Sequence, residues 1–318
     1  MIRLVATAFN DLPVAAGKIR EILEDEGELS VIPLPFHSLE DKEKPLWFDK
    51  IETADAFLIR SGIVDRWLIN QMKNCKVISL HGVGVDQVDV DYCKSKGIIV
   101  TNVPGGNANA AAELTIGMML DSLRGISKAN LEMKNEEWEK GKKIGNELGS
   151  SKVGILGMGN IGSKVASLCE AFGAEVAFYD KYSNNTKYKS MEFNDLLKWC
   201  EILTIHVPLN DSTRSLISLK ELELLGPNGI IVNVARGPII NQKDLTYALN
   251  NKLIKWAACD VFDSEPPNFN DVLFSLQNTT LTPHLGGSTY ECLDTIATIT
   301  TEDILKVCKG EKPNNPVY

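Results

Sequence analysis

Short apolar runs alternate with amphipathic, helix-like segments along this chain. In the first hundred residues, each of three apolar runs precedes a helical pattern. These pairs are Leu4–Thr7 with Lys18–Glu26, Ala56–Arg60 with Asp65–Lys73, and Lys76–Leu80 with Val88–Lys96. Strands that alternate with helices predict a mainly parallel sheet covered on both faces, with functional groups at the carboxyl ends of its strands.

The middle of the chain repeats this rhythm more strongly. Its candidate strands are Val153–Leu156, Glu175–Tyr179, Ile202–Val207, Ile230–Val234 and Trp256–Val261. A length of 318 residues exceeds the roughly 100 to 200 typical of one domain, so the pattern predicts two doubly wound α/β domains.

Two turn-rich segments, Asn102–Asn107 and Pro283–Gly287, are the expected hinges between these domains. The helical pattern from Thr289 to Cys308 would then return to the first domain. The prediction is a discontinuous domain of residues 1–101 and 288–318, with residues 102–287 inserted as the second domain.

The composition is that of an ordinary globular protein, with 44% hydrophobic and 24% charged residues and no run of about 18 apolar residues. A net charge of -9 argues against nucleic acid and anionic membranes as partners, but not against a small anion held by a local arginine. The seven cysteines form no C-x-x-C pair, so we expect reduced thiols and a cytoplasmic location. No targeting segment and no metal site are predicted.

A G-x-G-x-x-G motif stands at residues 157–162, between an apolar run and a helical pattern that stops at Gly173. In this context Gly157 permits a tight turn, Gly159 lets the backbone approach a pyrophosphate, and Gly162 lets helix and strand pack closely. The free N–H groups near Asn160 and Ile161 offer an anion site. The motif therefore predicts a dinucleotide-binding domain.

Asp180 follows the next predicted strand, and its carboxylate could hydrogen-bond the ribose 2′-hydroxyl and repel a 2′-phosphate. NAD is therefore expected rather than NADP. The adjacent Lys181 argues against this preference for NAD. The alternative is that Asp180 is an ordinary solvated turn residue.

Three polar residues, Arg236, Glu265 and His284, follow strand-like runs in the second half. Arginine can hold a carboxylate in one orientation, and histidine can exchange a proton with an alcohol or carbonyl oxygen near neutral pH. A carboxylate beside that histidine would fix its tautomer. Taken singly, each residue is more simply a surface cation or a loop residue, but together they predict hydride transfer between NAD and a 2-hydroxyacid or 2-ketoacid.

Several motifs together resemble the D-isomer-specific 2-hydroxyacid dehydrogenase family over nearly the whole chain. They are Gly157–Gly162, Asp180, Asn233–Gly237, Asp260–Pro266, Pro283–Gly287, His81–Asp86 and the segment Asn102–Leu120, with Arg, Glu and His in the family's order. The resemblance implies an R-specific reaction, a Rossmann NAD-binding domain inserted in a flavodoxin-like substrate domain, an active site in the cleft between them, and a homodimer joined through the NAD-binding domains.

The resemblance also implies further site residues. Asp260, Ala235 and Gly286 would lie at the nicotinamide end of the cofactor, and the backbone of Val83 and Gly84 would hold the substrate carboxylate. The residues expected on the adenine side are His206, Val207, Pro208 and Thr213. For His206, an ordinary wall residue is the alternative.

Within the family, the resemblance is closest to the D-3-phosphoglycerate dehydrogenases of serine biosynthesis, which implies Arg60, Ser61 and Lys140 as substrate-binding residues. Leu80 departs from this pattern, because phosphoglycerate-using relatives commonly carry an arginine there. A hydroxypyruvate or glyoxylate reductase, or another 2-ketoacid reductase, is therefore the alternative. A non-enzymatic, NAD-sensing corepressor-like scaffold is a third, which the intact Arg, Glu and His set disfavours.

Overall fold

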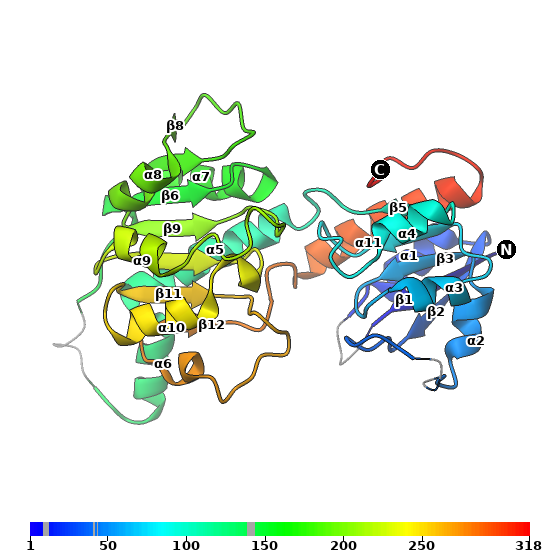
Figure 1. The fold of residues 1–318 in the computed structure, drawn as a ribbon, viewed down its shortest axis with the longest axis horizontal. Coiled ribbons are helices and arrows are strands. Elements are labelled where there is room, and N and C mark those ends of the chain that lie inside the picture. Colours follow the sequence, from blue (N-terminus) through cyan, green and yellow to red (C-terminus); the bar gives the residue numbers. More distant parts are fainter. Residues whose placement is uncertain (9–12, 41, 43, 139–143) are drawn as a thin grey trace. The chain divides into compact units, whose positions relative to one another are not determined.

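The computed structural model describes residues 1–8, 13–40, 42, 44–138 and 144–318. The chain forms two compact units, residues 1–107 with 287–318 and residues 108–286 (Figure 1). The boundaries differ from the expected ones because the turn at 102–107 is tied to the first unit. There the N–H of Val103 donates to the Gly82 carbonyl over 2.8 Å, and the Asn102 amide donates to the Val83 carbonyl over 2.8 Å.

The first unit contains a five-stranded parallel sheet in the order β2-β1-β3-β4-β5. Its strands are β1 (Ile2–Thr7), β2 (Gly27–Ile32), β3 (Ala56–Ile59), β4 (Val77–Leu80) and β5 (Ile99–Thr101). Its helices are α1 (Ala16–Leu23), α2 (Phe48–Thr53), α3 (Arg66–Gln71), α4 (Val90–Ser95) and α11 (Tyr290–Cys308). This strand order is that of flavodoxin-like folds, as predicted.

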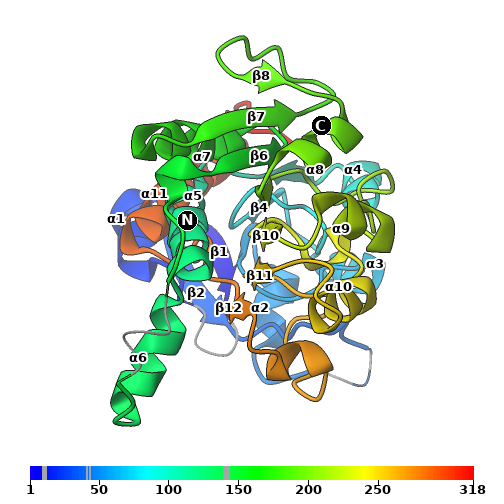
Figure 2. The same ribbon diagram turned by 90° about the vertical axis from the view of Figure 1, so that its left-hand side faces the viewer.

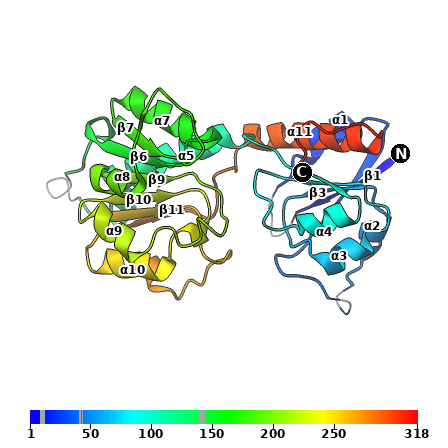
Figure 3. The same cartoon turned by 45° about the horizontal axis from the view of Figure 1, so that its top comes forward.

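Helices cover both faces of this sheet, with α1 and α11 on one face and α2, α3 and α4 on the other (Figure 3). The chain's last helix returns to this unit, as expected, and the Thr289 hydroxyl caps it by accepting the N–H of Cys292 over 3.1 Å. Its buried positions, among them Ala297, Ile304 and Val307, repeat at helical spacing and lie against the sheet.

The second unit contains a seven-stranded parallel sheet in the order β12-β11-β10-β9-β6-β7-β8. Its strands are β6 (Lys152–Leu156), β7 (Glu175–Tyr179), β8 (Lys189–Ser190), β9 (Ile202–Ile205), β10 (Ile230–Asn233), β11 (Trp256–Cys259) and β12 (Thr279–Leu281). The order reverses between β6 and β9, as in a Rossmann sheet, and ligands of such sheets bind outside the carboxyl ends of the strands at that point.

The helices of this unit are α5 (Ala108–Arg124), α6 (Ile126–Lys134), α7 (Asn160–Phe172), α8 (Phe193–Trp199), α9 (Leu219–Leu225) and α10 (Gln242–Asn250). Helices α5 and α7 cover one face of the sheet, and α8, α9 and α10 cover the other (Figure 2). The predicted α/β class and the arrangement of two doubly wound domains are confirmed.

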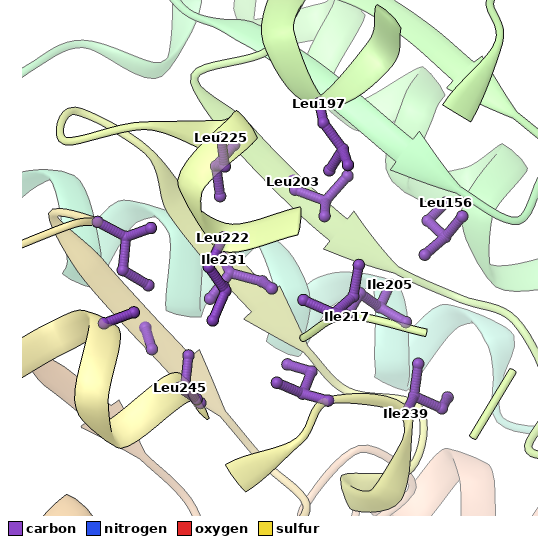
Figure 4. Packing of buried hydrophobic residues seen from close by; sticks show 14 of the residues in the cluster. Leu156, Leu197, Leu203, Ile205, Ile217, Leu222, Leu225, Ile231, Ile239 and Leu245 are labelled. Carbon is purple, nitrogen blue, oxygen red and sulfur yellow. The ribbon is translucent and has the colours of Figure 1, made fainter. Parts of the chain in front are cut away.

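Apolar side chains fill the layer between the second sheet and helices α8, α9 and α10 (Figure 4). Leu156, Leu203 and Ile231 come from the strands, while Leu222 and Leu245 come from the helices, and each is at most 2% exposed. Truncating such a leucine to alanine costs about 2–5 kcal/mol, so this layer holds the strand ends in fixed positions. The loops that carry the polar residues described below begin at those strand ends.

In the described residues, no helix is long and apolar enough to cross a membrane. All seven cysteines are free thiols in the structure.

Candidate active site

The glycine loop between β6 and α7 is shaped by close backbone contacts. Gly157 has a φ of +97°, and a Cβ there would lie 2.8 Å from the His206 carbonyl carbon. A Cβ on Gly162 would lie 2.0 Å from the Gly157 carbonyl oxygen. A Cβ on Gly159 would meet no atom within 4 Å. The first and third glycines are therefore required by packing, and the second leaves open space.

That open space lies at the N-terminus of α7, where Asn160 and Ile161 form the first turn. No side chain of the described residues caps this terminus, and the first turn contains no acidic residue. Unpaired N–H groups at a helix N-terminus favour an anion. The residues present therefore fit the pyrophosphate of NAD.

Asp180 lies beside this loop, as expected from its spacing. One carboxylate oxygen accepts the N–H of Met158, inside the glycine motif, over 2.7 Å. The other accepts the N–H groups of Tyr182 and Ser183 over 2.7 and 3.0 Å. The carboxylate is thus held against the glycine loop, where a ribose attached to the pyrophosphate would be found.

The expected adenine-side residues follow β9, and the first two, His206 and Val207, lie against the same loop. The N–H of His206 donates to the Leu156 carbonyl over 2.7 Å, its Nε2 hydrogen-bonds the Thr204 hydroxyl, and burial lowers the pKa of its imidazole to about 3. His206 is therefore a neutral wall residue. Val207 is half-buried against the Gly157 turn and Pro208 is exposed.

The Thr213 hydroxyl closes the turn after these residues. It donates to the Pro208 carbonyl over 2.6 Å and accepts the N–H of Asn210 over 2.8 Å. Thr213 thus shapes the turn through its side chain.

Arg236 extends from the loop after β10. The Asn233 side chain ties this loop by accepting the N–H of Ala235 over 3.0 Å and donating to the Arg236 carbonyl over 2.9 Å. A Cβ on Gly237 would lie 2.0 Å from the Phe262 carbonyl carbon, so the loops after β10 and β11 touch through bare backbone. This contact brings the Arg236 loop next to the loop that carries Glu265.

Glu265 and His284 form the central pair of the site. Their Oε2 and Nδ1 atoms are 2.6 Å apart, and the other Glu265 oxygen accepts the N–H of Phe262 over 3.2 Å. Burial alone would raise the pKa of Glu265, but the His284 hydrogen bond and charge, the Phe262 N–H and the Arg236 charge together bring it below its ordinary value. Glu265 is therefore an ionised acceptor, which places the His284 proton on Nδ1 and leaves Nε2 to exchange protons.

The backbone of His284 lies in the left-handed region, with a φ of +55°. Its N–H donates to the Asp260 carbonyl over 2.8 Å, while the Asp260 carboxylate accepts the N–H groups of Leu285 and Gly286 and the Thr282 hydroxyl over 2.6 to 2.8 Å. Burial raises the pKa of Asp260. Asp260 thus holds the segment from Thr282 to Gly286, and with it the ring of His284.

The structure therefore gathers Arg236, Glu265 and His284 at one end of the second sheet, together with Ala235, Asp260 and Gly286. Sequence reasoning missed two residues that support them, Asn233 and Thr282. The only signal in the sequence was their position inside the quoted motifs. The Asn233 side chain bonds within its own loop, whereas the partner of Thr282, the Asp260 carboxylate, follows the neighbouring strand β11.

Of the other residues expected to bind the substrate, Arg60, Ser61, Val83 and Gly84 lie in the first unit, and Lys140 is outside the described residues. The Ser61 side chain is fully buried and its hydroxyl donates to the Leu34 carbonyl over 3.2 Å, so that hydroxyl supports the fold. The N–H groups of Val83 and Gly84 have no acceptor among the described residues, which suits an anion. Arg60 is half-buried at the carboxyl end of β3.

Comparison with known proteins agrees with this geometry. Residues 116–286 match the family described as "D-isomer specific 2-hydroxyacid dehydrogenase, NAD binding domain". The D-3-phosphoglycerate dehydrogenase of Methanocaldococcus jannaschii is 40% identical over 304 residues, which cover 93% of this chain and 56% of that protein. The chain thus spans about half the length of that relative.

A second relative has nearly the same length as this chain. The hydroxypyruvate reductase of Thermotoga maritima is 35% identical over 291 residues, which cover 90% of this chain and 93% of that protein. Among solved structures, the TT0316 protein of Thermus thermophilus superposes with a TM-score of 0.89 at 27% identity, covering 99% of this chain and 100% of that one. The chain belongs to the D-isomer-specific 2-hydroxyacid dehydrogenase family.

Proposed function

We propose that this chain is an NAD-dependent dehydrogenase that interconverts a D-2-hydroxyacid and its 2-ketoacid. The observation that carries the proposal is the 2.6 Å contact between Glu265 and His284, with the Arg236 charge acting on the same carboxylate. A histidine fixed at Nδ1 by a carboxylate is arranged for proton exchange at Nε2, and its side chain is 48% exposed.

Each residue has one task in this reaction. NAD, when bound, supplies the hydride acceptor, and its reduced form supplies the donor. In oxidation the hydroxyl proton passes to Nε2 of His284, and in reduction Nε2 returns that proton to the carbonyl oxygen. The ionised Glu265 stabilises the imidazolium that forms. The Arg236 guanidinium would bind the substrate carboxylate and fix the orientation of the reacting carbon.

The glycine loop and Asp180 would hold NAD. Open space at Gly159 would admit the pyrophosphate to the N-terminus of α7. The Asp180 carboxylate would accept a ribose hydroxyl and repel a 2′-phosphate, which favours NAD over NADP.

For the substrate we propose 3-phosphoglycerate, oxidised to 3-phosphohydroxypyruvate as in serine biosynthesis. Supporting this choice are the identity to the D-3-phosphoglycerate dehydrogenase of M. jannaschii and the half-buried Arg60. Leu80 is an apolar side chain that is fully buried in the first core, so this position offers no charge to a phosphate. That fact, and the identity to a hydroxypyruvate reductase, favour the second candidate, an unphosphorylated 2-ketoacid.

The deciding experiment measures NADH oxidation with 3-phosphohydroxypyruvate, hydroxypyruvate, glyoxylate and pyruvate. We expect kcat/KM for the phosphorylated acid to lead by about tenfold or more, and Arg60→Ala to abolish that lead. A lead for an unphosphorylated acid would establish the second candidate. No turnover of any 2-ketoacid, with NADH still bound, would favour the binding scaffold.

We also propose that the chain forms a homodimer through its NAD-binding unit. Helix α6 supports this proposal, because none of its residues is buried and Ile126, Leu131 and Met133 expose apolar side chains. Exposed apolar side chains gathered on one element are typical of an interaction surface.

A further inference from the structure

Arg60 and His81 lie side by side in the first unit, at the carboxyl ends of β3 and β4. These strands are parallel, and Ile59 pairs with Leu80, so the next residue of each strand is also adjacent to its counterpart. A terminal nitrogen of Arg60 lies 2.8 Å from Nδ1 of His81. Leu80 packs into the core between the sheet and helices α2 to α4, so His81, the next residue along, points toward the opposite face.

This contact determines which ring nitrogen of His81 carries the proton. An arginine side chain only donates hydrogen bonds, so Nδ1 of His81 must accept and the ring proton lies on Nε2. Burial and the neighbouring Arg60 charge lower the pKa of His81 to about 3. The ring therefore stays neutral near pH 7 and presents an Nε2–H donor.

Two donors of this pair lack acceptors. The Nε2 of His81 and the Nε of Arg60 are both shielded from solvent, and neither has a hydrogen-bond partner among the described residues. Buried donors in folded proteins are nearly always paired, so an acceptor outside the described protein atoms is required here.

The Arg60 charge also lacks a counter-ion in the described part of the chain. Besides His81, the Arg60 charge acts on the Cys292 thiol in the first turn of α11, and burial raises the pKa of that thiol. A neutral thiol and a neutral imidazole leave the guanidinium charge uncompensated. The missing acceptor is therefore best supplied by an anion.

We infer that His81 is a substrate-binding residue, which donates its Nε2–H to an anionic oxygen of the substrate while its Nδ1 holds Arg60 toward the same group. This inference rests on the proposed function. The bound oxygen belongs to either a phosphate or a carboxylate group of the substrate. Comparing substrates with and without a phosphate distinguishes these two groups.

The variants His81→Asn and His81→Ala separate binding from support of Arg60. The Asn side-chain oxygen lies near the position of Nδ1 and can still accept the hydrogen bond from Arg60. Asparagine has no donor at the position of Nε2. If His81 binds substrate, both variants raise KM by about tenfold while kcat changes little. If His81 only positions Arg60, His81→Asn matches the wild type, and the inference is overturned.

The substrate panel identifies the group that is bound. A rise in KM for 3-phosphohydroxypyruvate alone identifies the phosphate, and an equal rise for hydroxypyruvate identifies the carboxylate. Urea unfolding that matches the wild type over the whole chain shows that the first unit, which contains His81, is folded in each variant. The exposed His37 provides the matched control, and His37→Asn should leave KM unchanged.

A second measurement does not depend on turnover. The chain has four histidines, so proton–nitrogen NMR spectra of their rings can be assigned with His81→Asn. We expect a neutral His81 ring protonated at Nε2 from about pH 6 to pH 8, whose Nε2–H signal shifts when 3-phosphoglycerate or inorganic phosphate is added without NAD. A proton on Nδ1, or no shift at saturation with either ligand, overturns the inference even in an active enzyme. If the Nε2–H signal shifts as expected but the protein oxidises no NADH, only the proposed reaction is overturned.

Discussion

His284 combines a proton-exchanging ring with a backbone conformation that few side chains adopt. A left-handed φ is uncommon outside glycine, and such positions gather at functional sites. Two backbone hydrogen bonds and the Asp260 carboxylate hold the segment in that conformation. The orientation of the ring is therefore set by the protein before any ligand binds.

We predict that His284→Asn lowers kcat by about 10²- to 10⁴-fold with little change in melting temperature, because asparagine tolerates a left-handed backbone but cannot exchange the proton. Steady-state kinetics and thermal melting test this prediction. Near-normal kcat in the variant would assign the proton exchange to another residue.

We predict that Glu265→Gln lowers kcat by about tenfold or more and also destabilises the protein in a pH-dependent way. The folded-state pKa of Glu265 is lowered from its ordinary value of 4.5. Its stabilising contribution is therefore complete above about pH 4.5 and is lost as the pH falls through the folded pKa. The melting temperatures of wild type and variant should differ at pH 7 and converge in acid. A difference that does not depend on pH would contradict an ionised Glu265.

The residue types of the site could be predicted from the sequence, but the residues that hold them in place could not. Arg236, Glu265 and His284 each follow a strand, and their chemistry suits one reaction. Asp260 was expected at the nicotinamide, and the structure adds that its carboxylate ties down the segment around His284. Such a role depends on which strands are neighbours in the sheet, and a single sequence does not show that.

At the scale of elements, the two α/β domains were predictable because buried parallel strands form continuous apolar runs. Three strands, β2, β5 and β8, were not predicted. In the edge strand β2, apolar and polar residues alternate little and most side chains are accessible to solvent. Strand β8 has only two residues, and β5 has three. Predicted strands also ran too long, as for Ile202–Val207, because the apolar pattern continues into the cofactor loop after the hydrogen-bonded ladder ends at Ile205.

The glycine loop allows a matched pair of substitutions. Gly159→Ala should fold normally, since a Cβ there meets nothing within 4 Å, but should raise the Kd for NADH by about tenfold or more because the methyl group occupies the proposed pyrophosphate space. Gly162→Ala should instead destabilise the unit by about 1–3 kcal/mol, because its Cβ would lie 2.0 Å from a backbone oxygen. Calorimetric titration and urea unfolding separate the two. Tight NADH binding by Gly159→Ala would place the pyrophosphate elsewhere.

At the scale of the whole molecule, the second unit is one continuous segment with its own core. We predict that residues 108–286, expressed alone, fold and bind NADH, because the glycine loop, Asp180 and the Arg236, Glu265 and His284 set all lie within it. The fragment should reduce no 2-ketoacid at a measurable rate, since Arg60, Val83 and Gly84 are absent. Quenching of tryptophan fluorescence by NADH tests binding, with the Gly159→Ala fragment as the control. An unfolded fragment would show that the second unit requires the first.

We predict that the double variant Ile126→Lys with Leu131→Lys is monomeric, whereas the wild type is a dimer. Lysines would place like charges on the apolar surface of α6. Light scattering after size-exclusion chromatography measures the mass of each protein. Val272→Lys, at a position 54% exposed elsewhere in the unit, is the control and should remain dimeric. A wild-type monomer, or a dimer that survives in the double variant, would reject α6 as the interface.

The two units carry different proposed functions, so one unit could be exchanged for that of a relative. The residues proposed to bind NAD and exchange the proton lie within 108–286, whereas Arg60 and His81 lie in the first unit. The first unit could therefore be replaced by that of a relative, with joints at 107/108 and 286/287, while the chemistry is retained. We predict that a chimera built in this way inherits the substrate preference of the donor.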